Sequence, residues 1–202
     1  MGLDVRLTAR PIGRTLVPEE KLPLRWKTIS EKTVSANQWF SLNLADVELP
    51  DGRHLDHYLL RQPPVAIAAL LNSENHVLLL WRHRFIPDSW GWELPSGKVE
   101  EGEEITEAAG REALEETGWE AADLQHLMTL EVSSGFSDAR HHVCWTDRVR
   151  YIGPPVDAHE SDRVEWVPLD DVPRLITDGD IRAAHTVAAL LTLRQMQSDA
   201  LA

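Results

Sequence analysis

The chain has 202 residues, of which 43% are hydrophobic and 26% are charged, an ordinary balance for a globular protein with one full-sized core and an appendage. Its formal net charge of -13 argues against wide contact with nucleic acid, because such contact needs lysines and arginines that displace counterions from phosphates. An acidic protein that binds an anionic substrate needs metal ions or a few placed arginines to neutralise its site.

The cysteine content and the apolar runs bear on the cellular compartment. Cys144 is the single cysteine and cannot form an internal disulfide, which favours a reducing compartment. Residues 1–15 contain no apolar segment typical of a signal peptide, and the longest uninterrupted apolar run, residues 65–71, is too short to span a bilayer. We therefore expect a cytoplasmic protein that binds neither membrane nor nucleic acid.

Residues 1–62 predict an N-terminal arm followed by a β-segment. Residues 1–23 contain three prolines and no steady periodicity, which is typical of an arm. Strands are expected at 26–34, 38–49 and 53–61, which are rich in β-branched and aromatic residues. Pro-Asp-Gly at 50–52 favours a tight turn, so the second and third strands are expected to pair as a hairpin. Three strands are too few for an independent core, so this segment needs the rest of the chain or a second subunit to pack against.

Residues 63–202 predict a domain of mixed strands and helices. Strands are expected at 65–71, 77–85, 127–132, 141–149 and 163–169, and helices at 104–117, 170–179 and 181–197. Gly118 suits the end of the first helix, whereas Gly110 inside that helix costs about 1 kcal/mol relative to alanine. This mixed order of elements favours an α+β fold.

The helix predicted at 104–117 carries three carboxylates on one face, because Glu112, Glu115 and Glu116 stand at i, i+3 and i+4. Like charges at this spacing destabilise a helix, and the helix dipole disfavours anions near the C-terminal end. A bound divalent cation would offset both effects, since Mg²⁺ takes hard oxygen ligands and completes its shell with phosphates and waters. The alternative is a solvated acidic face.

The residues around this helix favour the metal site over the solvated face. Gly97 and Gly102 turn the chain tightly between a strand and the helix. Glu103 stands at the start of the helix, where a carboxylate is favourable. Arg111 lies within reach of the acidic face and can hold one carboxylate in place.

The same segment resembles the signature of a known family. Residues 97–119, GKVEEGEEITEAAGREALEETGW, match the Nudix box G-x5-E-x7-R-E-U-x-E-E-x-G-U at every interval, through Gly97, Glu103, Arg111, Glu112, Glu115, Glu116 and Gly118. Ala113 and Trp119 occupy the two bulky apolar positions, and Ala113 is smaller than the residue that the family usually carries there. The resemblance implies a Nudix fold, in which a mixed β-sheet is sandwiched between helices, with an N-terminal antiparallel β-segment.

A looser resemblance, over roughly residues 24–195, is to the ADP-ribose pyrophosphatase branch. WELPSGKVEEGE at 92–103 is similar to the WELPAG segment of that branch, and WRHRF at 81–85 takes the place of its RQYRF. The resemblance implies that residues 1–62 help to form a homodimer and that residues 63–202 are the hydrolase domain. Ser134 in place of a proline and Ala139 in place of a glutamate depart from the branch in a loop that helps to define the substrate pocket, so the substrate stays open.

The resemblance also implies roles for individual residues. The metal ligands would be Glu112, Glu116, Glu115 and the carbonyl of Ser96, holding Mg²⁺ or Mn²⁺. The substrate would contact Arg82, Arg84, Glu93 and Gly97. The catalytic residues would be Glu160 as general base, with Asp162 in reserve, and Glu115, Arg111 and Glu103.

The activity that follows is hydrolysis of the pyrophosphate bond of a nucleoside-diphosphate derivative, first of all ADP-ribose or another NDP-sugar, to a nucleoside monophosphate and a sugar phosphate. CDP-alcohols and dinucleotide cofactors are alternative substrates. A nucleotide-sensing Nudix module without activity is the alternative from another class, and the retention of Glu112, Glu115 and Glu116 favours the enzyme.

Other candidate sites carry weaker signals. His141, His142 and Cys144 resemble transition-metal ligands, but adjacent strand residues point to opposite faces, so the three do not easily converge. Lys98 after Gly97 lacks the spacing and the hydroxyl residue of a phosphate-binding loop. Trp90 or Trp92 could stack on a nucleobase, although a core position is the simpler interpretation.

Overall fold

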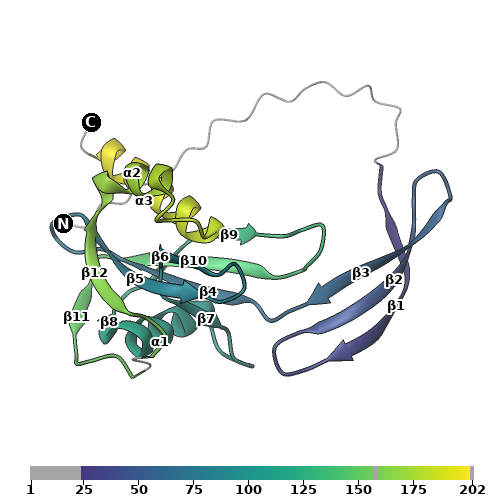
Figure 1. Cartoon of the computed structure of the whole chain (residues 1–202), viewed down its shortest axis with the longest axis horizontal. Helices are drawn as coiled ribbons and strands as arrows, with labels where there is room; N and C mark the ends of the chain where they lie inside the picture. Colours follow the sequence, from purple (N-terminus) through teal and green to yellow (C-terminus); the bar gives the residue numbers. More distant parts are fainter. Residues whose placement is uncertain (1–23, 157–158, 201–202) are drawn as a thin grey trace.

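The computed structural model of the chain describes residues 24–156 and 159–200 (Figure 1). A three-stranded N-terminal sheet stands to one side of a larger body, which contains the other strands and the helices of the described residues. The arm expected at residues 1–23 lies outside the described residues. The domain boundary expected after residue 62 falls between the third and fourth strands and stays a prediction.

The N-terminal sheet is an antiparallel meander of β1 (Lys27–Ala36), β2 (Ser41–Glu48) and β3 (His54–Arg61). The expected hairpin is confirmed: the Asp51 side chain accepts the N–H of Arg53 at 3.1 Å, and Gly52 takes the left-handed conformation with a φ of 82°. β1 is exposed along its whole length. The sheet joins the body through β3, where the N–H of Leu60 donates to the carbonyl of Phe136 at 2.8 Å.

The centre of the body is a four-stranded mixed sheet in the order β7-β4-β10-β9. Its strands are β4 (Val65–Leu70), β7 (Ser96–Lys98), β9 (Gln125–Glu131) and β10 (Arg140–Thr146). β4 and β10 run parallel, and β4 is continuously apolar because both of its faces are covered. Helix α1 (Ile105–Thr117) packs on one face and α3 (Ala184–Ala200) on the other, which confirms the α+β Nudix fold of a mixed sheet sandwiched between helices.

A second, antiparallel sheet in the order β12-β5-β6 carries several of the expected site residues. Its strands are β5 (His76–Arg84), β6 (Ser89–Glu93) and β12 (Arg163–Pro168). β12 continues through a short 3-10 turn, η1 (Leu169–Asp171), into α2 (Val172–Asp178). β8 (Trp119–Ala121) and β11 (Val149–Tyr151) form a two-stranded ribbon that begins directly after α1.

Helix α1 begins and ends where the sequence indicates. Gly118 has a φ of 74°, and its N–H donates to the carbonyl of Leu114 at 2.8 Å, as expected of the left-handed end of a helix. A Cβ at this position would also overlap the carbonyl of Gly153. Glycine is therefore needed here both for its conformation and for the close approach of another segment.

Two expected elements differ from the structure. The strand expected at 141–149 is broken, because the Thr146 hydroxyl donates to the carbonyl of Ala122 at 2.6 Å and accepts the N–H of Arg148 at 3.0 Å, which turns the chain before β11. The last helix, expected from residue 181, begins at Ala184. The short strands β6, β7 and β8 were not predicted, since segments of five residues or fewer carry little periodicity.

Candidate active site

Glu116, in the last turn of α1, lies buried at the centre of the site. Its side chain and that of Arg82 on β5 are each 3% exposed, and Arg82 Nη2 donates to Glu116 Oε1 at 2.8 Å. The backbone N–H of Ser96 donates to the other carboxylate oxygen at 2.8 Å. Burial raises the pKa of Glu116 to about 7, although Arg82 and the Ser96 N–H act to lower it. The ionised carboxylate is thus only partly compensated, and a cation would stabilise it.

Glu112 occupies space that a glycine leaves open. A Cβ at position 97 would overlap the Glu112 carboxylate, so glycine is needed for this carboxylate to lie against β7. Burial raises the pKa of Glu112, and Arg111 opposes that rise. Gly97 was expected to contact substrate, and the structure gives it a steric role toward Glu112.

Arg111 connects the loop before α1 to the acidic face of the helix. Its Nε donates to Glu103 Oε1 at 2.9 Å, and its Nη2 donates to the Lys98 carbonyl at 3.1 Å. Its Nη1 donates to Glu112 at 2.7 Å and to Glu115 at 3.0 Å. The hydrogen bond from Arg111 lowers the pKa of Glu103. Arg111 and Glu103 therefore form a scaffold that fixes the carboxylates of α1.

A second arginine–glutamate pair lies on the β5–β6 hairpin. Arg84 Nη2 donates to Glu93 Oε2 at 2.5 Å, and its Nε lies 3.1 Å from both carboxylate oxygens. The hydrogen bond to Glu93 raises the pKa of Arg84, and the charges of Glu116 and Glu160 act in the same direction. Arg84 is half-exposed, so the structure places an accessible cation beside the buried carboxylates.

Glu160 lies on the open side of the site. Its side chain is 58% exposed, and its Oε2 is 4.0 Å from Nη1 of the buried Arg82. Asp162, the reserve candidate for the general base, pairs with Arg163 at 3.6 Å. The structure therefore brings Glu160, and not Asp162, to the arginine that holds Glu116.

The donor set fits a hard divalent cation. Glu112, Glu115 and Glu116 offer carboxylate oxygens, the ligands that Mg²⁺ prefers. The pKa of Glu116 is raised although Arg82 is close, so additional positive charge would stabilise its ionised form. In this conformation Arg82 and Arg111 hold these carboxylates. Within residues 24–156 and 159–200, no three Asp, Glu, His or Cys side chains are arranged to hold a metal ion. The part of the Ser96 carbonyl as a ligand stays a prediction.

The burial of Arg82 and the position of His185 were not predicted from the sequence. Arg82 was expected to contact substrate, but it is buried beneath the carboxylates and holds Glu116, which favours a positioning role. His185 was not singled out, yet its ring lies against His141 with centroids 5.3 Å apart, and burial lowers its pKa to about 4. A histidine in the first turn of an apolar helix carries no distinctive sequence signal.

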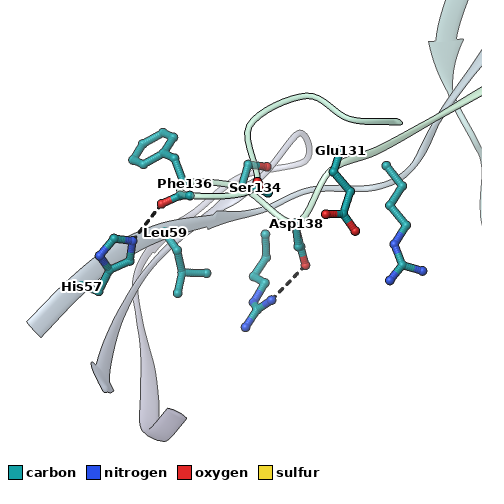
Figure 2. A pocket seen from close by; sticks show the side chains of 10 residues that line it. His57, Leu59, Glu131, Ser134, Phe136 and Asp138 are labelled. Carbon is teal, nitrogen blue, oxygen red and sulfur yellow. Dashed lines mark hydrogen bonds and ion pairs between the residues drawn. The ribbon is translucent and has the colours of Figure 1, made fainter. Parts of the chain in front are cut away.

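A cavity of about 290 Å³ lies between β3 and the loop that follows β9 (Figure 2). His57 Nε2 lies 3.0 Å from the carbonyl of Gly135, and Arg61 Nη1 donates to Asp138 at 3.1 Å, so the loop is tied to the N-terminal sheet. Ser134 lines this cavity, whereas Ala139 is buried. The two departures from the ADP-ribose pyrophosphatase pattern therefore lie where the N-terminal sheet meets the body.

Two family models match the chain in adjacent segments. One, described as NUDIX domain, matches residues 60–190, and the other, described as nucleoside diphosphate sugar hydrolase N-terminal domain, matches residues 26–60. The first match contains the carboxylates of α1, Arg82, Arg84, Glu93 and Glu160. The second match contains β1 and β2 and nearly all of β3.

Individual proteins are similar over nearly the whole chain. The CMP-5'-(N-acetyl-N-hydroxy-3-aminopropyl)phosphonate hydrolase of Streptomyces rubellomurinus is 35% identical over 170 residues, which cover 84% of this chain and 82% of the relative. The ADP-ribose pyrophosphatase of Bacillus subtilis is 29% identical over 175 residues, covering 83% and 95%. The crystal structure of an ADP compounds hydrolase has the same fold, with a TM-score of 0.77 and 22% identity over 89% of this chain and 97% of that chain. Together with the carboxylates that α1 presents to the site, these similarities show that the chain belongs to the Nudix hydrolase family.

Proposed function

We propose that this Nudix pyrophosphohydrolase cleaves the diphosphate bond of a nucleoside-diphosphate derivative, with ADP-ribose or another ADP-sugar as the first candidate. The products would be a nucleoside monophosphate and a sugar phosphate. The observation that carries the proposal is the buried carboxylate of Glu116 beside Glu112 and Glu115 on α1. Relatives named ADP-ribose pyrophosphatase support this substrate class.

The cofactor is Mg²⁺ in this proposal, with Mn²⁺ as a substitute. Glu112 and Glu116 would hold the cation, assisted by Glu115 and the carbonyl of Ser96. When bound, the cation supplies Lewis-acid polarisation of the phosphoryl oxygens and compensates the charge of the diphosphate. Nudix hydrolases generally use divalent metal ions, which supports this choice.

Side chains of the protein would position the metal ligands, stabilise the charge of the phosphates and accept a proton. Arg82 holds Glu116, and Arg111 orients Glu112. Arg84 is accessible and would place positive charge beside the phosphates, where it favours a transition state with charge on the oxygens. Glu160 would accept a proton from the attacking water at its carboxylate, since it lies at the open side of the site.

A nucleoside monophosphate joined to a phosphonate is a second candidate substrate. The relative from S. rubellomurinus is named for a CMP-phosphonate, and its identity to this chain is 35%. Ser134 and Ala139, which depart from the ADP-ribose pyrophosphatase pattern, support a substrate other than ADP-ribose itself. CDP-alcohols and dinucleotide cofactors complete the range, and the intact carboxylate set supports an enzyme over a nucleotide-sensing module.

A substrate panel tests the proposal. The purified chain would receive ADP-ribose, a second ADP-sugar, a CMP-phosphonate, a CDP-alcohol and a dinucleotide, each with Mg²⁺ or Mn²⁺, and a coupled phosphatase would report the products. We expect metal-dependent release of a nucleoside monophosphate, with one substrate class preferred in kcat/KM. Binding of nucleotide without cleavage of any of these compounds would contradict the enzyme and favour the sensing module.

The N-terminal sheet supports a homodimer. Ile29 and Val34 are exposed on β1, and Trp26 and Trp39 are exposed just before and after it. A three-stranded sheet with such a surface gains from a partner. Analytical ultracentrifugation should give twice the mass of the chain, and a monomer at all concentrations would contradict the dimer.

Among the described residues no helix is long and apolar enough to cross a membrane. The cytoplasmic location and the absence of membrane and nucleic-acid partners stay proposals from composition.

A further inference from the structure

Described residues on both sides of Glu160 are hydrogen-bonded to elements of the active site, α1 and β5. On the upstream side, the N–H of Val156 donates to the carbonyl of Glu115, in α1, at 2.9 Å. On the downstream side, the N–H of Asp162 donates to the carbonyl of Trp81, in β5, at 2.9 Å. Glu160 therefore lies two residues before a fixed backbone contact with the strand that also carries Arg82.

Arg163, the first residue of β12, reinforces the downstream contact. Its guanidinium carbon lies 5.2 Å from the ring centroid of Trp81 and 5.1 Å from that of Trp92. Arg163 pairs with Trp81 across β12 and β5, and Trp81 pairs with Trp92 across β5 and β6, so the three side chains form one row. An arginine over indole faces combines stacking with cation–π attraction.

The row lies on the face of this sheet opposite the carboxylates. Successive strand residues point to opposite faces, so Trp81 and Arg82 in β5 point in opposite directions. Trp92 packs in the apolar cluster that contains residues of α2 and α3, whereas Arg82 contacts Glu116 of α1. Arg163 therefore fixes the start of β12 from behind, and Glu160 emerges on the side of Arg82 and Glu116.

The ion pairs of Arg163 explain its position less well than its contact with the two indole rings does. Its Nη1 lies 3.2 Å from Glu165, and its Nε lies 3.6 Å from Asp162, and all three side chains are about half-exposed. Exposed pairs of this kind contribute little because water and salt screen them. The contact with two indole rings is the more specific restraint on Arg163.

We propose that Arg163 is a positioning residue for Glu160: its guanidinium, stacked on Trp81 and Trp92, holds the start of β12 so that Glu160 stays beside Arg82. This inference rests on the proposed role of Glu160 as general base. In this proposal Arg163 acts through the backbone of residues 160–163 and not by contact with the reacting groups.

A double-mutant cycle between Arg163 and Glu160 tests the proposal, using the full chain, Mg²⁺ and the best substrate of the panel. Arg163→Ala should lower kcat about tenfold, as misplacement of a proton acceptor does, and leave KM within about twofold. In the Glu160→Gln background the same substitution should have no further effect, because residues that act through one group are not additive. Hydrogen exchange of the Asp162 amide should become faster in Arg163→Ala.

Matched variants distinguish the effect of the stacking of Arg163 from the effects of its ion pair and of unfolding. Glu165→Gln removes the ion pair but leaves the guanidinium over the rings, and Arg150→Ala removes another exposed arginine–glutamate pair, so both should keep the wild-type kcat. Arg163→Gln gives a second, less drastic variant if Arg163→Ala unfolds, with the same expected direction. Equal losses of kcat in the two backgrounds, or unchanged exchange of the Asp162 amide, would overturn the inference. A wild-type kcat for Glu160→Gln would instead show that Glu160 is not the general base.

Discussion

Glu116 stands out among the site residues because its burial is compensated only in part. Arg82 and the Ser96 N–H each donate to it at 2.8 Å, yet burial still raises its pKa to about 7. The spacing of the glutamates predicted which carboxylates share a face. It did not predict that Arg82 would be the buried partner, because that depends on how β5 packs against α1 and not on any local pattern.

Substitution of Glu116 by glutamine keeps the shape and one oxygen acceptor for Arg82 but removes the negative charge. We expect kcat to fall by about a hundredfold to a thousandfold, as for loss of one electrostatic element of a site. Thermal unfolding should show a folded protein. Glu120→Gln, at an exposed glutamate paired with Arg150, is the matched control and should keep wild-type activity. Wild-type turnover in Glu116→Gln would contradict the assigned role.

The raised pKa of Glu116 also makes stability depend on pH. Because the folded pKa of about 7 lies above the usual 4.5, the native state keeps a proton that the unfolded state releases, so the metal-free protein loses stability as pH rises between these values. Mg²⁺ binds the ionised form and offsets this loss. The melting temperature should therefore rise more with Mg²⁺ at about pH 8 than at about pH 5.5. An equal rise in Glu116→Gln would speak against this explanation.

Among the secondary-structure elements, those with a long pattern or a clear turn were predicted and the short ones were not. Helix α1 has a glutamate-rich face and ends at Gly118, and the β2–β3 hairpin has its Pro-Asp-Gly turn. β7 has three residues and forms because it pairs with β4, a contact between segments far apart in the sequence. The divergence expected for adjacent histidines is confirmed, since His141 lies against His185 of α3 and His142 bonds to Thr129 at 3.0 Å.

Gly110 lowers the stability of α1, and substitution by alanine should raise it. A Cβ there would lie 3.4 Å from Leu124 Cδ1 and 4.0 Å from the Ala121 carbonyl, which is contact without overlap. Gly110→Ala should therefore stabilise the protein by about 0.5 to 1 kcal/mol, measured by urea unfolding. Gly118→Ala is the contrasting control and should destabilise, because Gly118 has a positive φ and touches Gly153. Destabilisation by Gly110→Ala would mean that α1 tolerates no added volume toward Leu124.

For the whole molecule, the fold gathers residues from α1, β5, β6, β7 and the segment before β12 into one site. The family resemblance implied this set of residues and the α+β architecture. The attachment of the N-terminal sheet to the loop after β9, through Leu60 and Arg61, was not predicted, because no local pattern encodes contacts between segments so far apart. That junction contains Ser134, one of the two departures from the ADP-ribose pyrophosphatase pattern.

Anomalous scattering from Mn²⁺, in crystals grown with a non-hydrolysable nucleoside-diphosphate analogue, tests the central claim most directly. We expect the manganese peak between the carboxylates of Glu112 and Glu116 and the diphosphate of the analogue, and its loss in Glu116→Gln crystals. Manganese bound only elsewhere, or an analogue bound with no metal against α1, would contradict the account.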